Sequence, residues 1–207
     1  MLHGLYVLTD SKYIPHQQWA ERVEKILLAG ANIIQLREKT LTEEQLLPHA
    51  LQLQEICHYY GAIFIINDHI RLTKKINASG VHIGRHDSSL RHAREYLGKD
   101  FIIGVSCYKH IYAAIQAQTL GADYVAFGSM HPSYTKVSAI RCPLGIISQS
   151  KRCLSIPVCA IGGISHKNVS PILRAGADMI ATSHSVFNAD DPSDSANKIF
   201  QQVIMSR

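Results

Sequence analysis

The sequence lacks the features that would assign it to a membrane, secreted or disulfide-rich class of protein. No apolar run approaches the roughly 18–20 residues that a membrane-spanning helix needs. The five cysteines are odd in number and show no Cys-x-x-Cys spacing, so they do not predict a disulfide framework. No basic leader precedes the first apolar run. From these absences we expect a cytoplasmic protein.

What the sequence does contain is the composition of an ordinary globular protein. Hydrophobic residues make up 46% of the chain and charged residues 18%, which excludes disorder as its main character. Because 207 residues suffice for one core and no linker divides them, we expect a single domain over residues 1–207. The net charge of +5 suits an anionic partner. Since the basic residues form no patch with aromatics, small phosphorylated ligands fit better than nucleic acid.

Short apolar runs alternate with amphipathic segments along the whole chain. The runs are continuous and do not alternate with polar residues, which is typical of a parallel sheet buried on both faces. We expect strands at residues 5–9, 33–37, 63–67, 81–83, 102–106, 124–128, 158–162 and 179–182. Among the amphipathic segments, we expect helices at residues 17–29, 43–60, 89–97, 111–120 and 168–175.

Three of the predicted strands are entered through the same short motif. It reads Gly-Ala-Asn at residues 30–32 and Gly-Ala-Asp at residues 121–123 and 176–178. We expect each glycine to end a helix in a left-handed conformation, so that the chain turns at once into the strand. Eight strand–helix units with such turns predict an α/β fold, a single-domain (β/α)8 TIM barrel, with an open doubly wound sheet as the alternative. In such a barrel, functional groups gather at the carboxyl ends of the strands.

The second predicted strand ends in an amide and two cations. Gln35, Arg37 and Lys39 are spaced two residues apart and therefore share one face of an extended chain. At the mouth of a barrel they would form an anion site, and a solvated strand end is the other interpretation. The fifth strand ends in Ser106, which offers a hydroxyl to a ligand.

Carboxylates follow the third and fourth predicted strands. Asn67 and Asp68 end the third strand, and Asp87 follows the fourth. Neighbouring barrel strands would bring the two carboxylates together beside the cations. They predict an Mg²⁺ site, because this ion takes one or two carboxylates together with phosphate oxygens. A cap for the helix that starts near Ile70 is the alternative role for Asp68.

Glycines and hydroxyls dominate the ends of the last three predicted strands. The loop after the sixth strand contains Ser133, Thr135 and Lys136, which combine directional donors with a mobile positive charge. The seventh strand leads to Gly163 and the eighth to residues 183–185. Backbone amides in these two loops commonly hold a phosphate in this fold.

Two further patterns receive a structural interpretation. His82 and His86 have the spacing of zinc ligands, but that spacing binds zinc on a helix, and here it spans a strand end and a loop. We therefore do not predict a zinc site. Tyr6 and Trp19 are assigned to packing in the core or at an interface.

Seven motifs occur in order, each at a strand end: residues 35–39, 67–68, 80–84 with Asp87, 104–106, 121–124, 135–136 and 160–164. Together they resemble the thiamine phosphate synthase (thiamine-phosphate pyrophosphorylase) family over nearly the whole chain. That family joins a pyrimidine-methyl diphosphate to a thiazole phosphate and releases diphosphate. The resemblance implies this transferase activity in thiamine biosynthesis, small-molecule substrates and an Mg²⁺ cofactor. It leaves a homodimer as an open alternative.

The resemblance also implies a role for each motif residue. Asp68 and Asp87 would hold Mg²⁺ on the diphosphate, and Gln35 would contact the pyrimidine. The diphosphate oxygens would be bound by Arg37, Lys39, Asn67, Ser106 and Lys136. The thiazole phosphate would be bound by Ser133, Thr135, Gly163, Ser183 and His184. Stabilisation of the leaving diphosphate as its charge develops would make these residues catalytic: Arg37, Lys39, Ser106 and Lys136.

The sequence departs from the family pattern at several of these positions. Ser129 stands where the family usually has a proline, His69 where it has an arginine, and His184 where it has a small hydroxyl residue. Two competing interpretations follow. One is a thiazole tautomerase of the same fold, which lacks the metal carboxylates and uses a histidine where Ser129 stands. The other is a protein that binds thiamine intermediates without catalysis.

Overall fold

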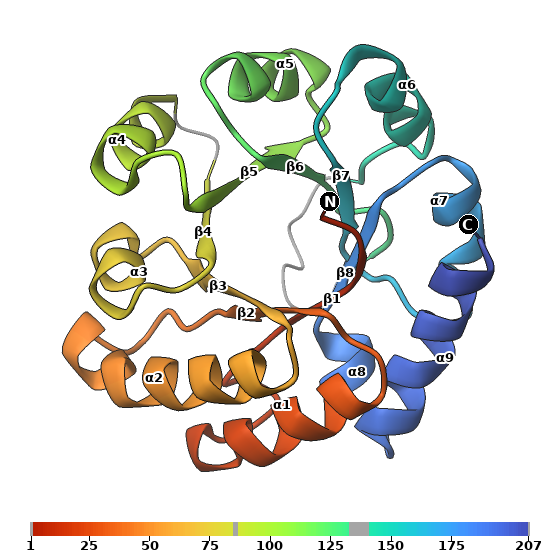
Figure 1. Cartoon of the computed structure of the whole chain (residues 1–207). Helices are drawn as coiled ribbons and strands as arrows, with labels where there is room; N and C mark the ends of the chain where they lie inside the picture. The colour runs from red at the N-terminus through yellow and green to blue at the C-terminus, as the bar shows by residue number, and fades with distance from the viewer. Residues whose placement is uncertain (1, 85–86, 133–140, 207) are drawn as a thin grey trace.

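Eight parallel strands close into a barrel that helices surround (Figure 1). The computed structural model describes residues 2–84, 87–132 and 141–206, and of residues 87–89 the backbone alone. The strands are β1 (Gly4–Leu8), β2 (Ile33–Leu36), β3 (Ile63–Asn67), β4 (Gly80–Ile83), β5 (Ile102–Tyr108), β6 (Tyr124–Phe127), β7 (Val158–Ile161) and β8 (Met179–Thr182). Because β1 pairs with both β2 and β8, the sheet is closed. This confirms the predicted (β/α)8 TIM barrel and excludes the open sheet.

The helices begin and end where local sequence signals place them. They are α1 (Trp19–Leu28), preceded by the short 3₁₀ helix η1 (His16–Gln18), α2 (Glu43–Tyr59), α3 (Ile70–Ile76), α4 (Asp87–Leu97), α5 (Ile111–Thr119), α6 (Gly145–Cys153), α7 (Ser170–Arg174), α8 (His184–Phe187) and α9 (Pro192–Met205). At the start of α2, Thr42 and Gln45 form a reciprocal capping box. In the parts of the chain that the structure describes, no helix has the length and apolar character to cross a membrane.

The predicted strands and helices agree with the structure to within two residues at each end. The differences have local causes. The strand β2 stops at Leu36 because the amide of Arg37 donates to the Thr9 hydroxyl (2.9 Å) and not to a strand carbonyl. The strand β5 runs on to Tyr108, which pairs with Phe127 after a shift in register.

The barrel separates two apolar layers. One lies between the sheet and the helices and includes Trp19, Val23 and Leu53. The other fills the barrel and contains Tyr6, Ile65 and Cys159, among others. Every residue of β1, β2, β4, β6 and β8 is buried, which confirms the expectation of strands covered on both faces.

The repeated strand-entry motif builds the amino end of the barrel. All three glycines have a positive φ, as predicted, and at Gly30 a side chain would also collide with the ring of Phe200 on α9. The aspartates of this motif accept hydrogen bonds from backbone amides of neighbouring strands. Asp123 accepts from the amide of Ile103 (2.7 Å) and pairs with Arg94 of α4 (2.6 Å). These residues are therefore structural.

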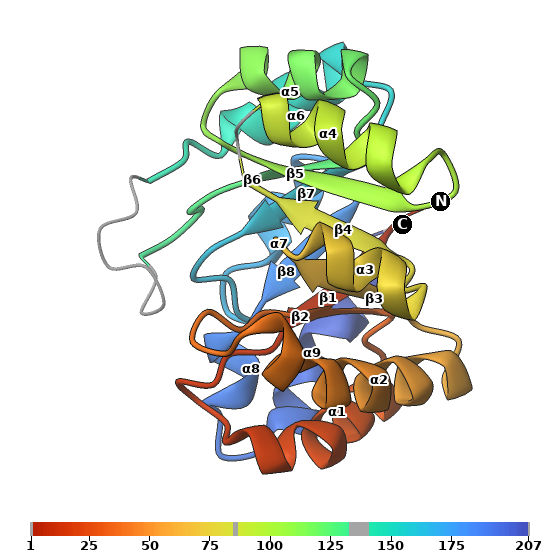
Figure 2. The same ribbon diagram turned by 90° about the vertical axis from the view of Figure 1, so that its left-hand side faces the viewer.

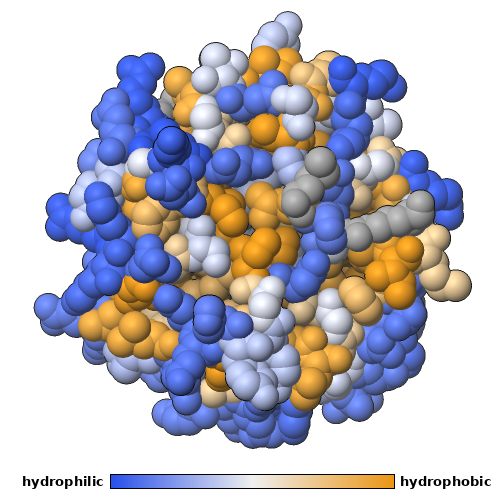
Figure 3. Space-filling model, viewed as in Figure 1, coloured by the Kyte–Doolittle hydropathy of each residue, from blue (hydrophilic) through white to orange (hydrophobic). Residues whose placement is uncertain are grey.

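The two ends of the barrel differ in character. Both termini lie at the amino ends of the strands, opposite the loops that follow the carboxyl ends (Figure 2). Figure 3 views that amino end and shows hydrophobic residues at its centre within a largely hydrophilic rim. Leu2, Ile63 and Ile102 pack there against the apolar filling of the barrel. Polar side chains inside the barrel lie toward the opposite end.

Candidate active site

A cavity of about 340 Å³ opens at the carboxyl ends of the strands. Residues from all eight strands or the loops that follow them line it. Of the residues predicted to form a site, those that line the cavity are Gln35, Arg37, Asn67, Ser106, Gly163, Ser183 and His184. The fold therefore gathers into one space residues that are spread over most of the sequence.

The remaining predicted site residues do not line this cavity as the structure describes it. Lys39 and Asp68 are exposed beside its mouth. Asp87 is the first residue of α4, and the structure describes only its backbone. Residues 133–136, with the predicted Ser133, Thr135 and Lys136, lie outside the described residues. The roles assigned to these residues stay predictions.

Arg37 is held at the mouth by the two residues that follow β1, Thr9 and Asp10. Its amide donates to Thr9, and its Nη1 lies 3.4 Å from Oδ2 of Asp10, which is buried. The Arg37 side chain is 16% exposed. At 3.4 Å the ion pair is longer than a strong charge-assisted hydrogen bond. A partly desolvated guanidinium with so loose a partner is suited to bind an anion in the cavity.

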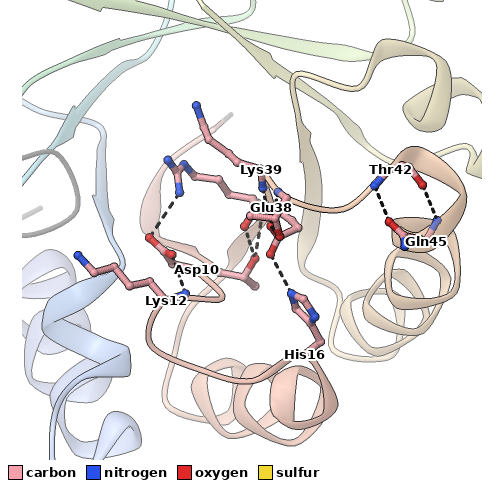
Figure 4. A network of polar contacts seen from close by, with 10 residues as sticks. Asp10, Lys12, His16, Glu38, Lys39, Thr42 and Gln45 are labelled. Carbon is pink, nitrogen blue, oxygen red and sulfur yellow. Dashed lines mark hydrogen bonds and ion pairs between the residues drawn. The ribbon is translucent and has the colours of Figure 1, made fainter.

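Glu38 lies between the two predicted cations in the sequence but does not line the cavity, and its carboxylate is directed toward His16 (Figure 4). Its side chain is fully buried. Oε1 accepts from the amides of Lys39 (2.7 Å) and Thr40 (2.6 Å), and Oε2 accepts from Nε2 of His16 (2.9 Å). Burial alone would raise the pKa of Glu38, but hydrogen bonds from Ser11, Thr40 and His16 outweigh it and hold that pKa far below its usual range.

The charged Glu38 carboxylate therefore anchors the loop on which both predicted cations stand. Sequence reasoning missed this role. The sequence contained one signal for it: an acidic residue stands directly between Arg37 and Lys39. A negative charge is unexpected in a site that binds anions, which indicates that this side chain has another role. The side chain avoids that conflict because it is directed toward His16 and does not line the cavity.

Asn67 and Asp68 form a tight unit at the end of β3. Nδ2 of Asn67 donates to Oδ2 of Asp68 (2.7 Å), and the Asp68 amide donates to the carbonyl of His82 on β4 (2.9 Å). Asp68 has a φ of 65°, a left-handed conformation that residues other than glycine seldom adopt. The helix α3 begins after His69 without a side-chain cap. The alternative that Asp68 caps this helix is therefore wrong.

The carboxylate oxygens of Asp68 are suitable ligands for a hard cation. An exposed carboxylate at the cavity mouth offers oxygen ligands, which Mg²⁺ prefers. In the described part of the chain, no group of three or more His, Cys, Asp or Glu side chains could hold a metal by itself. Mg²⁺ does not require such a group, since it keeps waters and takes substrate phosphate oxygens alongside one or two carboxylates.

Polar side chains also reach down into the barrel from the cavity. Tyr6, His82 and Tyr124 are buried there and are hydrogen bonded to one another, to Gln35 and to Ser106. Tyr6 and Trp19 are buried as predicted, but Tyr6 is also part of the cavity wall. Sequence reasoning missed this group because each residue stands singly within an apolar strand. The signal was a polar side chain at an inward position on several strands.

The ends of β7 and β8 present hydroxyls to the cavity. Thr182 (3.1 Å) and Ser185 (2.6 Å) both donate to the carbonyl of Ile164. In contrast, Oγ of Ser183 is buried and has no partner in the described part of the chain. His184 begins α8 and meets Tyr13 edge to face, with ring centroids 4.9 Å apart. Ser183 is therefore the hydroxyl in this loop that a ligand would satisfy.

A cavity that Arg37 and several hydrogen-bonding side chains line at the carboxyl ends of the strands defines the class of this protein, a (β/α)8 barrel with the arrangement typical of barrels that bind phosphorylated small molecules. Residues 5–186 match the family model described as thiamine monophosphate synthase. The chain belongs to the thiamine monophosphate synthase family. This confirms the resemblance inferred from the seven motifs.

Individual relatives agree with this assignment. The chain is 40% identical to thiamine-phosphate synthase of Thioalkalivibrio sulfidiphilus over 96% of its own length and 94% of the relative. It is 41% identical to thiamine-phosphate synthase of Thiobacillus denitrificans, covering 91% and 89%. The solved structure of thiamine phosphate pyrophosphorylase from Pyrococcus furiosus superposes with a TM-score of 0.89 at 30% identity, covering 98% and 96% of the two chains.

Proposed function

We propose that this protein is a thiamine phosphate synthase. It condenses 4-amino-2-methyl-5-pyrimidinylmethyl diphosphate with a thiazole phosphate and gives thiamine phosphate and diphosphate. The observation that carries the proposal is the cavity in which Gln35, Arg37, Asn67 and Ser106 converge, in a chain that belongs to this family. Its partners are these small molecules. A homodimer and a cytoplasmic location stay predictions.

The reaction exchanges one bond to the pyrimidine methylene carbon for another. The carbon–oxygen bond breaks and its electron pair leaves with the diphosphate. The lone pair of the thiazole nitrogen then forms the new carbon–nitrogen bond. Because that nitrogen is already nucleophilic, no side chain has to act as a base. The protein's task is to stabilise the negative charge that develops on the leaving group.

We assign the binding of the diphosphate to Arg37, Asn67 and Ser106. A guanidinium, an amide and a hydroxyl donate hydrogen bonds from different strands around one space. Such donors are fixed before the reaction and therefore require no reorganisation as charge develops. We assign the same task to Lys39 and to Lys136.

Asp68 and Asp87 would hold Mg²⁺ against the diphosphate. When bound, the ion would supply Lewis-acid stabilisation of the leaving group. The exposed carboxylate of Asp68, anchored through Oδ2 by Asn67, supports this assignment. The structure does not describe the side chain of Asp87, so its part rests on the family motif.

The opposite wall of the cavity would hold the thiazole phosphate. The unpartnered hydroxyl of Ser183 and the loop at Gly163 support this placement. His184 adds an imidazole to the same wall. We assign Ser133 and Thr135 to this phosphate as well.

The test is diphosphate release with the pyrimidine diphosphate, the thiazole phosphate and Mg²⁺, together with detection of thiamine phosphate. We expect both products in equal amounts. Folded protein that binds the substrates without turnover would contradict the proposal and support a binding protein. Isomerisation of the thiazole phosphate without diphosphate release would contradict it and support the tautomerase.

A further inference from the structure

A continuous hydrogen-bond chain runs through the barrel from Gln35 to Ser106. Nε2 of Gln35 donates to the hydroxyl of Tyr6 (2.5 Å), which is 2.9 Å from the hydroxyl of Tyr124. The Tyr124 hydroxyl is 2.9 Å from Nδ1 of His82, whose Nε2 is 2.8 Å from Oγ of Ser106. We call these five residues the interior chain. Both of its ends line the cavity.

The sequence makes room for this chain at one position. In the sheet, Gly104 of β5 lies between His82 of β4 and Tyr124 of β6. A side-chain carbon at residue 104 would lie 2.0 Å from the Tyr124 ring. Without it, the rings of His82 and Tyr124 approach to 5.5 Å between centroids. Glycine at this position is thus required for the interior chain to pass from β6 to β4.

Each hydroxyl of the interior chain has a single proton, and so does a neutral His82 ring, so with a neutral ring the hydrogen bonds all run one way. Burial raises the pKa of Tyr6 and of Tyr124, and both phenols are therefore neutral. Tyr6 accepts from Gln35 and donates to Tyr124, which donates to Nδ1 of His82. Nε2 of His82 then carries the ring proton and donates to Ser106. The Ser106 hydroxyl keeps its own proton for a ligand in the cavity.

Turning the Gln35 amide by half a turn reverses every bond in the interior chain. The Gln35 oxygen would accept from Tyr6, and the reversal would continue until Ser106 donated its proton to His82. Ser106 would then present lone pairs alone to the cavity, which repel an anion. As long as the His82 ring is neutral, any other arrangement leaves a buried hydroxyl proton or ring nitrogen without a partner, which is costly.

The forward direction also fixes what Gln35 presents to the cavity. One N–H of its Nε2 donates to Tyr6, which turns Oε1 away from Tyr6, and in the described part of the chain this buried oxygen has no partner. Gln35 is only 2% exposed. An unpartnered buried acceptor at a cavity wall requires a donor from the ligand. An amino group on a ring meets that requirement.

We propose that the interior chain couples the binding of the two halves of the pyrimidine substrate. An anion that accepts a hydrogen bond from Ser106 selects the direction of the chain in which Gln35 accepts from an amino group. In the same way, an amino group bound at Gln35 selects the direction in which Ser106 donates to the anion. Tyr6, Tyr124 and His82 are then positioning residues that act through Gln35 and Ser106. The inference rests on the proposed function for the identity of the two ligands. It adds that their affinities depend on each other through the barrel interior.

Calorimetry with two separate probes measures this coupling. The probes are inorganic diphosphate with Mg²⁺ and 4-amino-2,5-dimethylpyrimidine, which is the ring without its leaving group. In the wild-type protein we expect a saturating concentration of the pyrimidine to lower the Kd of diphosphate at least about fivefold. Tyr124→Phe and Tyr6→Phe each interrupt the interior chain. In both variants we expect the ratio of the diphosphate Kd without the pyrimidine to the Kd with it to fall toward one, while each probe still binds.

The matched control is Tyr60→Phe. It also removes a tyrosine hydroxyl from a hydrogen bond, in this case to Glu24 at the surface (2.8 Å), and should keep the wild-type coupling. Equal coupling in the wild type and in Tyr124→Phe would overturn the proposal, as would a wild type that binds both probes independently. A wild type that binds neither probe would instead contradict the proposed function.

The ring of His82 gives a second measurement, which is read on the wild-type protein. In ¹⁵N-histidine-labelled wild-type protein with diphosphate and Mg²⁺ bound, we expect a neutral ring with its proton on Nε2. The signal is assigned by its loss in His82→Gln. A ring with its proton on Nδ1 in that complex would overturn the inferred direction.

Discussion

The two ends of the barrel use charged side chains in opposite ways. At the amino end, Asp178 accepts from the amide of Val158 (2.7 Å) and pairs with Lys151 (2.7 Å), so that donors of the same chain satisfy its charge. At the carboxyl end, Arg37 has a loose partner at 3.4 Å, and Ser183 has a buried hydroxyl without a described partner. The charge of Asp178 at the amino end is thus satisfied within the chain, whereas Arg37 and Ser183 at the carboxyl end can be satisfied by a ligand.

This difference shows how strand-end residues of the same chemical type can be told apart. Two aspartates that stand before a strand are paired with a cation from the helix one strand–helix unit earlier: Asp123 with Arg94 of α4, and Asp178 with Lys151 of α6. Such pairing stabilises the fold. Asp68, which stands after a strand, is exposed and has a left-handed backbone, which is a strained conformation of the kind that collects at functional sites.

Removal of the metal tests the carboxyl end most severely. We expect a chelator to lower turnover at least about 10³-fold, because the leaving diphosphate loses several kcal/mol of charge stabilisation. Added Mg²⁺ should restore turnover, and Asp68→Asn should require more Mg²⁺ than the wild type. Asp178→Asn is the matched control and should keep the wild-type Mg²⁺ requirement. Diphosphate release that persists unchanged in chelator would remove the metal assignment.

The substitution Arg37→Met tests the cation at the mouth. We expect kcat/KM to fall about 10²–10³-fold, which is the usual cost of removing one fixed donor from a developing negative charge. Arg37→Lys should lie between Arg37→Met and the wild type, because it keeps the charge but loses the planar donor group. Steady-state kinetics, with circular dichroism to confirm folding, measures both. An Arg37→Met enzyme with near-normal kcat/KM would show that Arg37 does not touch the diphosphate.

The substitution Glu38→Gln tests whether a buried carboxylate at the carboxyl end both stabilises the fold and positions the loop that carries Arg37 and Lys39. We expect KM for the pyrimidine diphosphate to rise about tenfold, because the loop that carries Arg37 and Lys39 loses its charged anchor. A double variant with Lys39→Ala measures whether the two effects add. If they add fully, Glu38 does not act through Lys39.

The same variant should change how stability depends on pH. The pKa of Glu38 is lowered in the folded state, so its contribution to stability is complete above the unfolded pKa of about 4.3 and is lost as the pH falls below that value toward the folded pKa. Urea unfolding at pH 5 and at pH 3 measures this loss. Glu38→Gln should lose less free energy of unfolding over this interval than the wild type, and an equal loss would contradict the inferred charge.

The smallest expected effect on activity is that of Asp178→Asn. Loss of the charged partner of Lys151 should lower the free energy of unfolding by about 1–2 kcal/mol and Tm by about 3–6 °C. The kcat/KM of folded protein should stay within about twofold of the wild type, since a perturbation at the amino end leaves the site intact. A large fall in kcat/KM without loss of stability would reverse the distinction between the two ends.

Local sequence determined the elements of this protein and much of its cavity. Continuous apolar runs placed the strands, the glycine motif placed the helix ends, and counting strand ends brought Gln35, Asn67 and Ser106 to one cavity. These inferences succeed because strand burial and helix termination depend on neighbours in the chain. The inference that the strand ends meet at one cavity requires only the topology of the barrel, which the repeated strand–helix units specify.

Tertiary structure alone decided which side chains meet across the barrel. The hydrogen bond between Tyr6 and Tyr124 joins residues 118 positions apart, and it depends on the room left by Gly104 on a third strand. The direction of Glu38, toward His16, depends on how the 3₁₀ helix η1 packs against the loop from β2 to α2. Sequence periodicity assigns a residue to a face of a strand, but the closure of the barrel determines the partner that it finds there.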